Sequence, residues 1–210
     1  MTNSTRIAIV DTARSLFSRG LTHGSTGNIS ARSGDLILVT PTGSSLGTVQ
    51  PDGLSMIDAD GQHVDGPVPS KEAFLHAAML RARPQAGAVI HTHSTFSAAV
   101  SCLIPDDPSD ILPPLTAYFV MRIGKLPLLP YHAPGDDRLG DAAEAAARTN
   151  AALMLSNHGP IVAAKNLGAA MDALEELEQT ARLHLTLRGM NVRHLVTDEV
   201  DDLVSRYGRP

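Results

Sequence analysis

The chain has 210 residues, 43% of them hydrophobic, which is enough for one substantial core and too little for two comfortable domains, so we predict one domain over residues 1–210. A formal net charge of -5, without a run of Lys or Arg, argues against nucleic acid or an anionic membrane surface as the partner. The single cysteine, Cys102, cannot form an internal disulfide, and the N-terminal residues lack the apolar run of a signal peptide or membrane span, so we expect a cytoplasmic protein. The apolar neighbours of Cys102 predict a buried side chain.

Amphipathic helices are predicted where apolar residues recur at a spacing of three and four. Four segments have this spacing, in chain order residues 7–17, 75–82, 171–185 and 200–207. Gly20, Pro84 and Gly189 predict where the first three helices end. Thr197 is the expected N-cap of the fourth helix.

Strands are predicted by short apolar runs that lie beside turn residues. They are residues 36–39, 56–57, 88–90, 153–155 and 161–163. Asp60-Gly61 predicts a hairpin turn, and residues 157–160 predict a tight connection between the last two strands. Because strands interleave with helices and several strands are joined by hairpins, we predict an α/β sandwich with a mixed or mainly antiparallel central sheet covered by helices.

Three histidines follow predicted strands and indicate a metal site. His91 and His93 stand two residues apart, where extended backbone places both imidazoles on one face. One metal ion can bridge such a pair, although two surface histidines at a strand end have the same pattern. His158 precedes Gly159 in a predicted turn, which aims its side chain outward from a sheet end. Three imidazoles with an open fourth position are typical of catalytic zinc, and Mn²⁺, Co²⁺ or Fe²⁺ also suits them.

Two loops rich in glycine and hydroxyl residues, 24–30 and 40–45, offer backbone N–H groups and side-chain donors to an anion. Ordinary turns have a similar composition, and neither loop matches the P-loop or the dinucleotide-binding pattern. Ser70 and Lys71 are expected to open the second helix, where Ser70 can cap it, Lys71 adds positive charge and the helix dipole favours an anion. Together these segments predict a phosphate site.

Glu72 is the candidate general base, because metal chemistry on a hydroxy-carbonyl compound needs a carboxylate that moves a proton. The alternative is that Glu72 only complements the helix dipole. Tyr118, one of three tyrosines, could donate a proton across a site or merely pack. His76, one helical turn after Glu72, could support a site side chain, and helix packing explains it equally well.

The motifs on which these predictions rest occur together in one order. They are Gly-x-x-Gly-Asn ending at Asn28, Thr40-Pro41-Thr42-Gly43, Pro69-Ser70-Lys71-Glu72, His91-x-His93 and Asn157-His158-Gly159. In this arrangement the chain resembles the class II aldolase family of fuculose and ribulose phosphate enzymes, also called the aldolase/adducin family. The resemblance extends from the region of Gly20 to the helix that ends near Gly189.

The resemblance implies one divalent metal per subunit held by His91, His93 and His158, with Glu72 as the acid/base and as a ligand that substrate displaces. It also implies a phosphate site at Asn28, Thr42, Gly43 and Ser70, and with Gly27 and Lys71 these are the candidate substrate-binding residues. The family forms homotetramers with active sites at subunit interfaces, where a tyrosine of the neighbouring subunit protonates the product. Tyr118 is the match for that tyrosine.

Two departures from typical aldolases are similar to the 3-oxo-tetronate 4-phosphate decarboxylase branch. Lys71 stands where the aldolases have a second serine, and residues 112–122 are unlike theirs. An extra ammonium would help to hold a substrate that has a carboxylate besides its phosphate. The implied reaction is loss of carbon dioxide to give dihydroxyacetone phosphate through a metal-stabilised enediolate.

Three alternatives to this decarboxylase remain open. An aldolase that cleaves a ketose 1-phosphate, such as fuculose or ribulose phosphate, needs the same enediolate, and a dehydratase of a methylthio-ribulose phosphate uses the same scaffold. A non-catalytic, adducin-like interaction module is the third alternative. Such a module would be expected to lack the metal histidines, which this chain retains.

Overall fold

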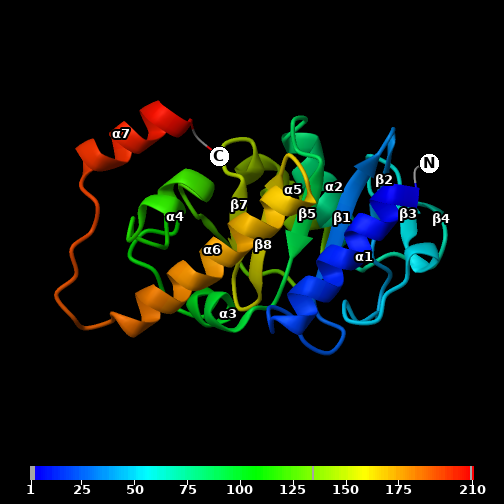
Figure 1. The fold of residues 1–210 in the computed structure, drawn as a ribbon, viewed down its shortest axis with the longest axis horizontal. Coiled ribbons are helices and arrows are strands. Elements are labelled where there is room, and N and C mark those ends of the chain that lie inside the picture. The colour runs from blue at the N-terminus through cyan, green and yellow to red at the C-terminus, as the bar shows by residue number, and fades with distance from the viewer. Residues whose placement is uncertain (1–2, 134, 209) are drawn as a thin grey trace.

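The computed structural model describes residues 3–133, 135–208 and 210, and in them an eight-stranded sheet lies between two layers of helices (Figure 1). The strands are β1 (Asn28–Ser33), β2 (Leu36–Val39), β3 (Ser55–Ile57), β4 (His63–Asp65), β5 (Ala88–His91), β6 (Leu128–Leu129), β7 (Ala152–Leu155) and β8 (Gly159–Ala164). Their order is β4-β3-β2-β1-β5-β8-β7-β6, and every neighbouring pair is antiparallel except β6 and β7. The prediction of a mixed, mainly antiparallel sheet is confirmed.

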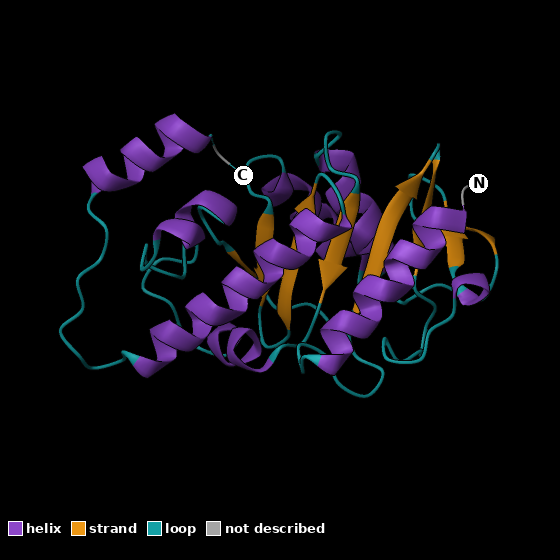
Figure 2. Cartoon of the chain, viewed as in Figure 1, coloured by secondary structure: helices purple, strands orange, loops and turns teal. Residues whose placement is uncertain are grey.

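The helices cover both faces of this sheet. They are α1 (Asn3–Ser18), α2 (Ala73–Ala82), α3 (Thr95–Ser101), α4 (Ala117–Arg122), α5 (Asp137–Ala147), α6 (Leu167–Thr186) and α7 (Thr197–Tyr207), with a short 3-10 turn, η1 (Pro51–Gly53). One apolar cluster joins α1, α3, α4 and α6 to the sheet, and a second joins α2 and α5 to its other face. Figure 2 shows α1 and α6 crossing the near face, with α2 and α5 behind the strands. No helix among the described residues is long and apolar enough to cross a bilayer.

Side chains alternate between the two clusters along the central strands, which explains why these strands are apolar throughout. In β5, Ile90 belongs to the cluster with α1 and α6, whereas Val89 belongs to the cluster with α2 and α5. Leu38 and Ile37 of β2 divide in the same way. Successive strand residues point to opposite faces, so a strand buried on both sides needs an uninterrupted apolar run.

The nine elements predicted from the sequence are present, although three local details differ. α2 begins at Ala73, so Glu72 takes the N-cap position and does not lie in the first turn. Thr197 is the first residue of α7, and Val196 occupies the cap position. The prediction of a buried Cys102 is wrong: its side chain is exposed, because Cys102 follows the last residue of the short helix α3.

The pairing of β5 with its two neighbours brings distant segments of the chain to one edge of the sheet. His91, the last residue of β5, pairs with Asn28 at the start of β1 and with Ile161 near the start of β8. In antiparallel pairs the end of one strand lies beside the start of the next. The end of β5, the start of β1 and the turn before β8 therefore meet, and this edge contains the predicted metal histidines.

Candidate metal centre

His91 has a single ring orientation because its buried imidazole is held by the backbone. Its Nδ1 lies 2.8 Å from the carbonyl oxygen of Pro160, and its side chain is fully buried. A carbonyl only accepts, so Nδ1 carries the proton and Nε2 presents a lone pair. Histidines that bind metals are commonly oriented by such a bond.

His158 is held in the turn between β7 and β8 by the end of α3. The N–H of His158 donates to Ser101 Oγ at 3.0 Å, and the N–H of Asn157 donates to the Ser101 carbonyl at 3.0 Å. Gly159 lies against the Thr92 carbonyl, which a Cβ at this position would overlap. Glycine at this position therefore permits a close approach of the two backbone segments.

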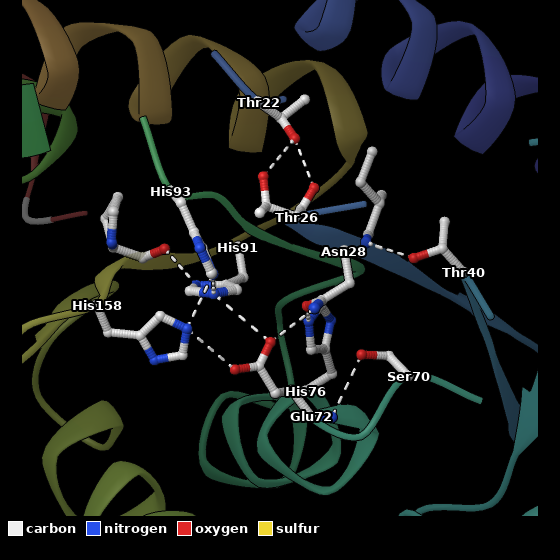
Figure 3. Close-up of polar contacts among 12 residues, drawn as sticks. Thr22, Thr26, Asn28, Thr40, Ser70, Glu72, His76, His91, His93 and His158 are labelled. Atoms are coloured by element: carbon white, nitrogen blue, oxygen red, sulfur yellow. Dashed lines mark hydrogen bonds and ion pairs between the residues drawn. The ribbon is translucent and has the colours of Figure 1, made fainter. Parts of the chain in front are cut away.

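The three imidazoles and Glu72 converge on one point (Figure 3). His93 Nε2 lies 3.0 Å from His91 Nε2 and 2.9 Å from His158 Nε2. Glu72 places Oε1 3.2 Å from His158 Nε2 and Oε2 3.5 Å from His91 Nε2. One ligand atom from each of the four residues lies within 4.8 Å of the others. Since nitrogen lone pairs that face one another repel, this donor set fits a divalent cation between them.

The protonation states suit metal binding. Burial, assisted by the charges of His91 and His158, lowers the pKa of His93 to about 3. Burial also lowers the pKa of His158, followed by the charge of His91. Both imidazoles are therefore neutral near pH 7, which is the form that binds a metal. Burial by itself would raise the pKa of Glu72, but His91, a hydrogen bond from Asn28 and His158 together lower it to about 2, so the carboxylate is ionised.

Glu72 faces the histidines and not the solvent. Its side chain is mostly buried, and Oε2 accepts a hydrogen bond from Asn28 Nδ2 at 2.7 Å. The N–H of Glu72 donates to Ser70 Oγ at 3.3 Å, which holds the turn before α2. The alternative that Glu72 only complements the helix dipole does not account for this orientation.

The sequence model of one family, the class II aldolase and adducin N-terminal domain, matches residues 7–185 of this chain. The chain belongs to this family. A 3-oxo-tetronate 4-phosphate decarboxylase of Haemophilus influenzae is 44% identical over 199 residues, which are 94% of this chain and 95% of the relative. An L-fuculose phosphate aldolase of Escherichia coli K12 is 33% identical over 180 residues, 85% of this chain and 81% of the relative.

A solved structure supports the same assignment. YgbL of Klebsiella pneumoniae, described as an aldolase, epimerase or decarboxylase, has a TM-score of 0.94 and 42% identity, covering 97% of this chain and 99% of that one. The predicted family and fold class are therefore confirmed. Similarity to these proteins shows the family and the fold, whereas the role of each residue is inferred from the geometry of the site.

The loops predicted to bind a phosphate in this family member lie next to Glu72. The N–H of Thr42 donates to the Val68 carbonyl at 3.0 Å, and the N–H of Ser70 donates to the Thr40 carbonyl at 3.2 Å. These bonds join the loop of Thr42 and Gly43 to the segment of Ser70. Thr42, Gly43 and Lys71 are exposed, and Lys71 has no hydrogen-bond or ion-pair partner among the described residues.

Gly27 and Asn28 have structural partners in addition to their predicted phosphate role. Gly27 has a φ of 79°, and a Cβ there would lie 2.9 Å from the His91 carbonyl oxygen, so glycine lets β1 start beside the end of β5. Asn28 uses both polar side-chain atoms within the protein, donating to Glu72 and lying 2.5 Å from His76 Nε2. The Asn28 side chain therefore holds Glu72 in this structure.

Tyr118 is not brought to the metal centre of its own chain. It lies on α4 with 60% of its surface exposed, and the Arg122 guanidinium lies 5.8 Å from its ring centroid. Among the described residues, no recorded contact joins Tyr118 to Glu72 or the three histidines. The family resemblance assigns this tyrosine to the site of a neighbouring subunit, and that assignment stays a prediction.

Two residues beside the centre have partners that the sequence did not predict. Ser30 is fully buried and lies 2.7 Å from His76 Nδ1. Glu178 of α6 accepts hydrogen bonds from the N–H groups of Phe96 and Ser97, both at 2.8 Å, and so fixes the start of α3 just after His93. The polar alternation of Asn28 and Ser30 on β1 was the available signal for the first, whereas only the fold reveals the second.

Proposed function

We propose that the chain is a metal-dependent decarboxylase that converts a 3-oxo-tetronate 4-phosphate to dihydroxyacetone phosphate and carbon dioxide, with residues 1–210 as one catalytic domain. The observation that carries the proposal is the convergence of three histidine Nε2 atoms and the Glu72 carboxylate. Curated relatives of this name at 43% identity or more support the substrate.

His91, His93 and His158 would hold the metal, with Glu72 as a further ligand in the absence of substrate. We propose Zn²⁺, because three imidazoles and one open position are typical of catalytic zinc, although Mn²⁺, Co²⁺ and Fe²⁺ accept the same ligands. When bound, such a cation acts as a Lewis acid that stabilises negative charge on the substrate oxygens.

The residues beside the centre would bind the two anionic ends of the substrate. The Gly43 N–H and the hydroxyl groups of Thr42 and Ser70 would hold the phosphate, because N–H and O–H donors in open loops suit phosphate oxygens. Lys71, exposed and without a partner among the described residues, would hold the carboxylate. The Lys71 ammonium would thus favour a phosphorylated sugar acid over a sugar phosphate that has no carboxylate.

Glu72 would manage the proton of the reaction. The bond between C1 and C2 of the β-keto acid breaks, carbon dioxide leaves, and the electron pair moves to the 3-oxo group. C2 then takes up one proton, which gives dihydroxyacetone phosphate. Glu72 is ionised and adjacent to the metal ligands, so it can take the proton of the 2-hydroxyl group and deliver it to C2, after which the 2-oxygen regains a proton from water.

Aldol cleavage is the second candidate function, since the E. coli L-fuculose phosphate aldolase is 33% identical. The same metal and acid/base residues would serve it, because an aldehyde would leave in place of carbon dioxide. Lys71 favours the decarboxylase, since a ketose 1-phosphate has no carboxylate to bind. A non-catalytic module would not require four converging metal-ligand side chains.

One experiment separates these functions. Purified zinc-loaded protein is incubated with 3-oxo-tetronate 4-phosphates and, separately, with ketose 1-phosphates, and dihydroxyacetone phosphate, carbon dioxide and aldehyde are measured. We expect dihydroxyacetone phosphate and carbon dioxide from the sugar acid. An aldehyde from the ketose phosphate alone would establish the aldolase, and no product from either would contradict both.

The proposal includes a homotetramer with sites at subunit interfaces, as the family resemblance implies, and a cytoplasmic location in sugar-acid catabolism. Tyr118 would then contribute to the site of a neighbouring subunit. Light scattering of the purified protein gives the subunit number. A monomer with full activity would remove the interfacial role of Tyr118.

A further inference from the structure

A row of hydrogen bonds leads from Glu72 through Asn28 and His76 to Ser30, and Figure 3 shows the Asn28 and His76 side chains beside Glu72. Asn28 donates to Glu72 Oε2 at 2.7 Å, the Asn28 Oδ1 lies 2.5 Å from His76 Nε2, and His76 Nδ1 lies 2.7 Å from Ser30 Oγ. His76 and Ser30 are fully buried, and Asn28 is 5% exposed. Water therefore has little access to these groups, and each must find its partner within the row.

The chemistry of the acceptors determines the direction of every bond. The Glu72 carboxylate only accepts, so the Asn28 NH₂ group must face it and the Asn28 oxygen must face His76. That oxygen requires a proton on His76 Nε2. In a neutral imidazole Nδ1 then has the lone pair, which the Ser30 hydroxyl satisfies as donor. Burial, followed by the charge of His91, lowers the pKa of His76 to about 3, so the ring is neutral.

We propose that His76 is a positioning residue for Glu72: its Nε2–H holds the Asn28 amide in the one orientation that donates to the carboxylate. This rests on the proposed function only in assigning Glu72 the acid/base role. A flipped Asn28 amide would place its oxygen against the carboxylate and its NH₂ group against the Nε2–H of His76. Both contacts would be repulsive, so the protonated Nε2 excludes the flip.

The row supplies what an acid/base near a metal needs. Glu72 can move a proton only if its carboxylate stays free of the cation once substrate binds, and the hydrogen bond from Asn28 would hold Oε2 through a group that is not a metal ligand. A bond whose donor can rotate away would not do this. The packing interpretation of His76 requires only its volume, whereas the positioning role requires a donor at the place of Nε2.

The tautomer of His76 is the first test and needs no turnover. In zinc-loaded protein labelled with ¹⁵N-histidine, NMR distinguishes an Nε2–H imidazole from an Nδ1–H imidazole and from an imidazolium. We expect the neutral Nε2–H form at pH 7. A neutral Nδ1–H form, which has no proton on Nε2, would overturn the proposal whether or not the chain is a decarboxylase.

Two substitutions separate positioning from packing. His76→Gln keeps an N–H donor close to the place of Nε2, whereas His76→Leu keeps apolar volume and no donor. We expect His76→Leu to lose roughly ten- to a hundredfold in kcat, as for one hydrogen bond to a charged group, with KM and zinc content little changed. His76→Gln should recover most of this loss.

The matched control is Leu75→Val, a buried change on the same helix whose side chain belongs to the apolar cluster shared with α5. Its melting temperature and its kcat are both measured, and together they show how a small packing loss in α2 changes the activity. Equal kcat for His76→Leu and wild type, or equal loss in His76→Leu and His76→Gln, would refute the positioning role. Wild type that turns over no phosphorylated substrate refutes the proposed function instead, and the NMR result then still decides the direction of the row.

Discussion

Lys71 offers the sharpest test of substrate choice, because its removal should cost the fold nothing. Its side chain is exposed and lacks a hydrogen-bond or ion-pair partner in the described part of the chain, so Lys71→Ser breaks no recorded interaction. A hydrogen bond from an ammonium to a carboxylate contributes about 1.5 to 3 kcal/mol. We therefore expect Lys71→Ser to lower kcat/KM for the sugar acid roughly ten- to a hundredfold.

The assay compares two substrates in the same variant. Steady-state release of dihydroxyacetone phosphate is measured with a 3-oxo-tetronate 4-phosphate and with a ketose 1-phosphate, and Lys165→Ser, an exposed lysine distant in sequence from the loops, serves as control. The kcat/KM of Lys71→Ser should fall for the sugar acid and much less for the ketose phosphate. Equal loss for both substrates would place the ammonium on the shared phosphate, and no loss for either would make Lys71 a solvated residue, so either result refutes the reasoning.

Three further predictions concern the metal centre. His93→Ala should purify folded with greatly reduced metal content, measured by elemental analysis, and full occupancy would remove His93 from the ligands. Burial lowers the pKa of His76 and of His93 to about 3 in the folded state, so below pH 6.5 the unfolded state binds more protons than the folded state. Metal-free protein should therefore become less stable to urea as the pH falls from about 6.5 towards 3. A stability that does not change with pH in this range would contradict the prediction. Gly159→Ala should lower the melting temperature and zinc affinity, because its Cβ would overlap the Thr92 carbonyl, whereas Gly168→Ala on α6 should change neither.

Local sequence patterns predicted the elements whose side chains repeat regularly. The apolar faces of α1, α2, α6 and α7 follow helical spacing, and β2, β5 and β8 are apolar runs because both of their faces are buried. The patterns did not predict β1, where Asn28 and Ser30 interrupt the apolar run. These polar residues belong to the row of hydrogen bonds that begins at Glu72, so residues of the site interrupt the apolar pattern that would have predicted the strand.

Local sequence patterns also did not predict the helices α3, α4 and α5. α3 and α4 are too short for a periodic stripe, with 7 and 6 residues, and the buried face of α5 has one large apolar side chain, Leu139, beside Gly140, Ala143 and Ala147. The start of α3 is also set by a contact from a distant part of the chain. Glu178, 81 residues further along the chain than Ser97, accepts the hydrogen bonds that fix the start of α3.

The sequence alone identified the histidines of the centre, because two histidines that stand two residues apart on extended backbone share a face. Their meeting with Glu72 and His158 was decided by tertiary structure. His158 lies 65 residues beyond His93, and only the antiparallel pairing of β5 with β8 brings the two Nε2 atoms within 2.9 Å. The orientation of Asn28 is likewise tertiary, since a hydrogen-bond direction depends on partners that local spacing cannot specify.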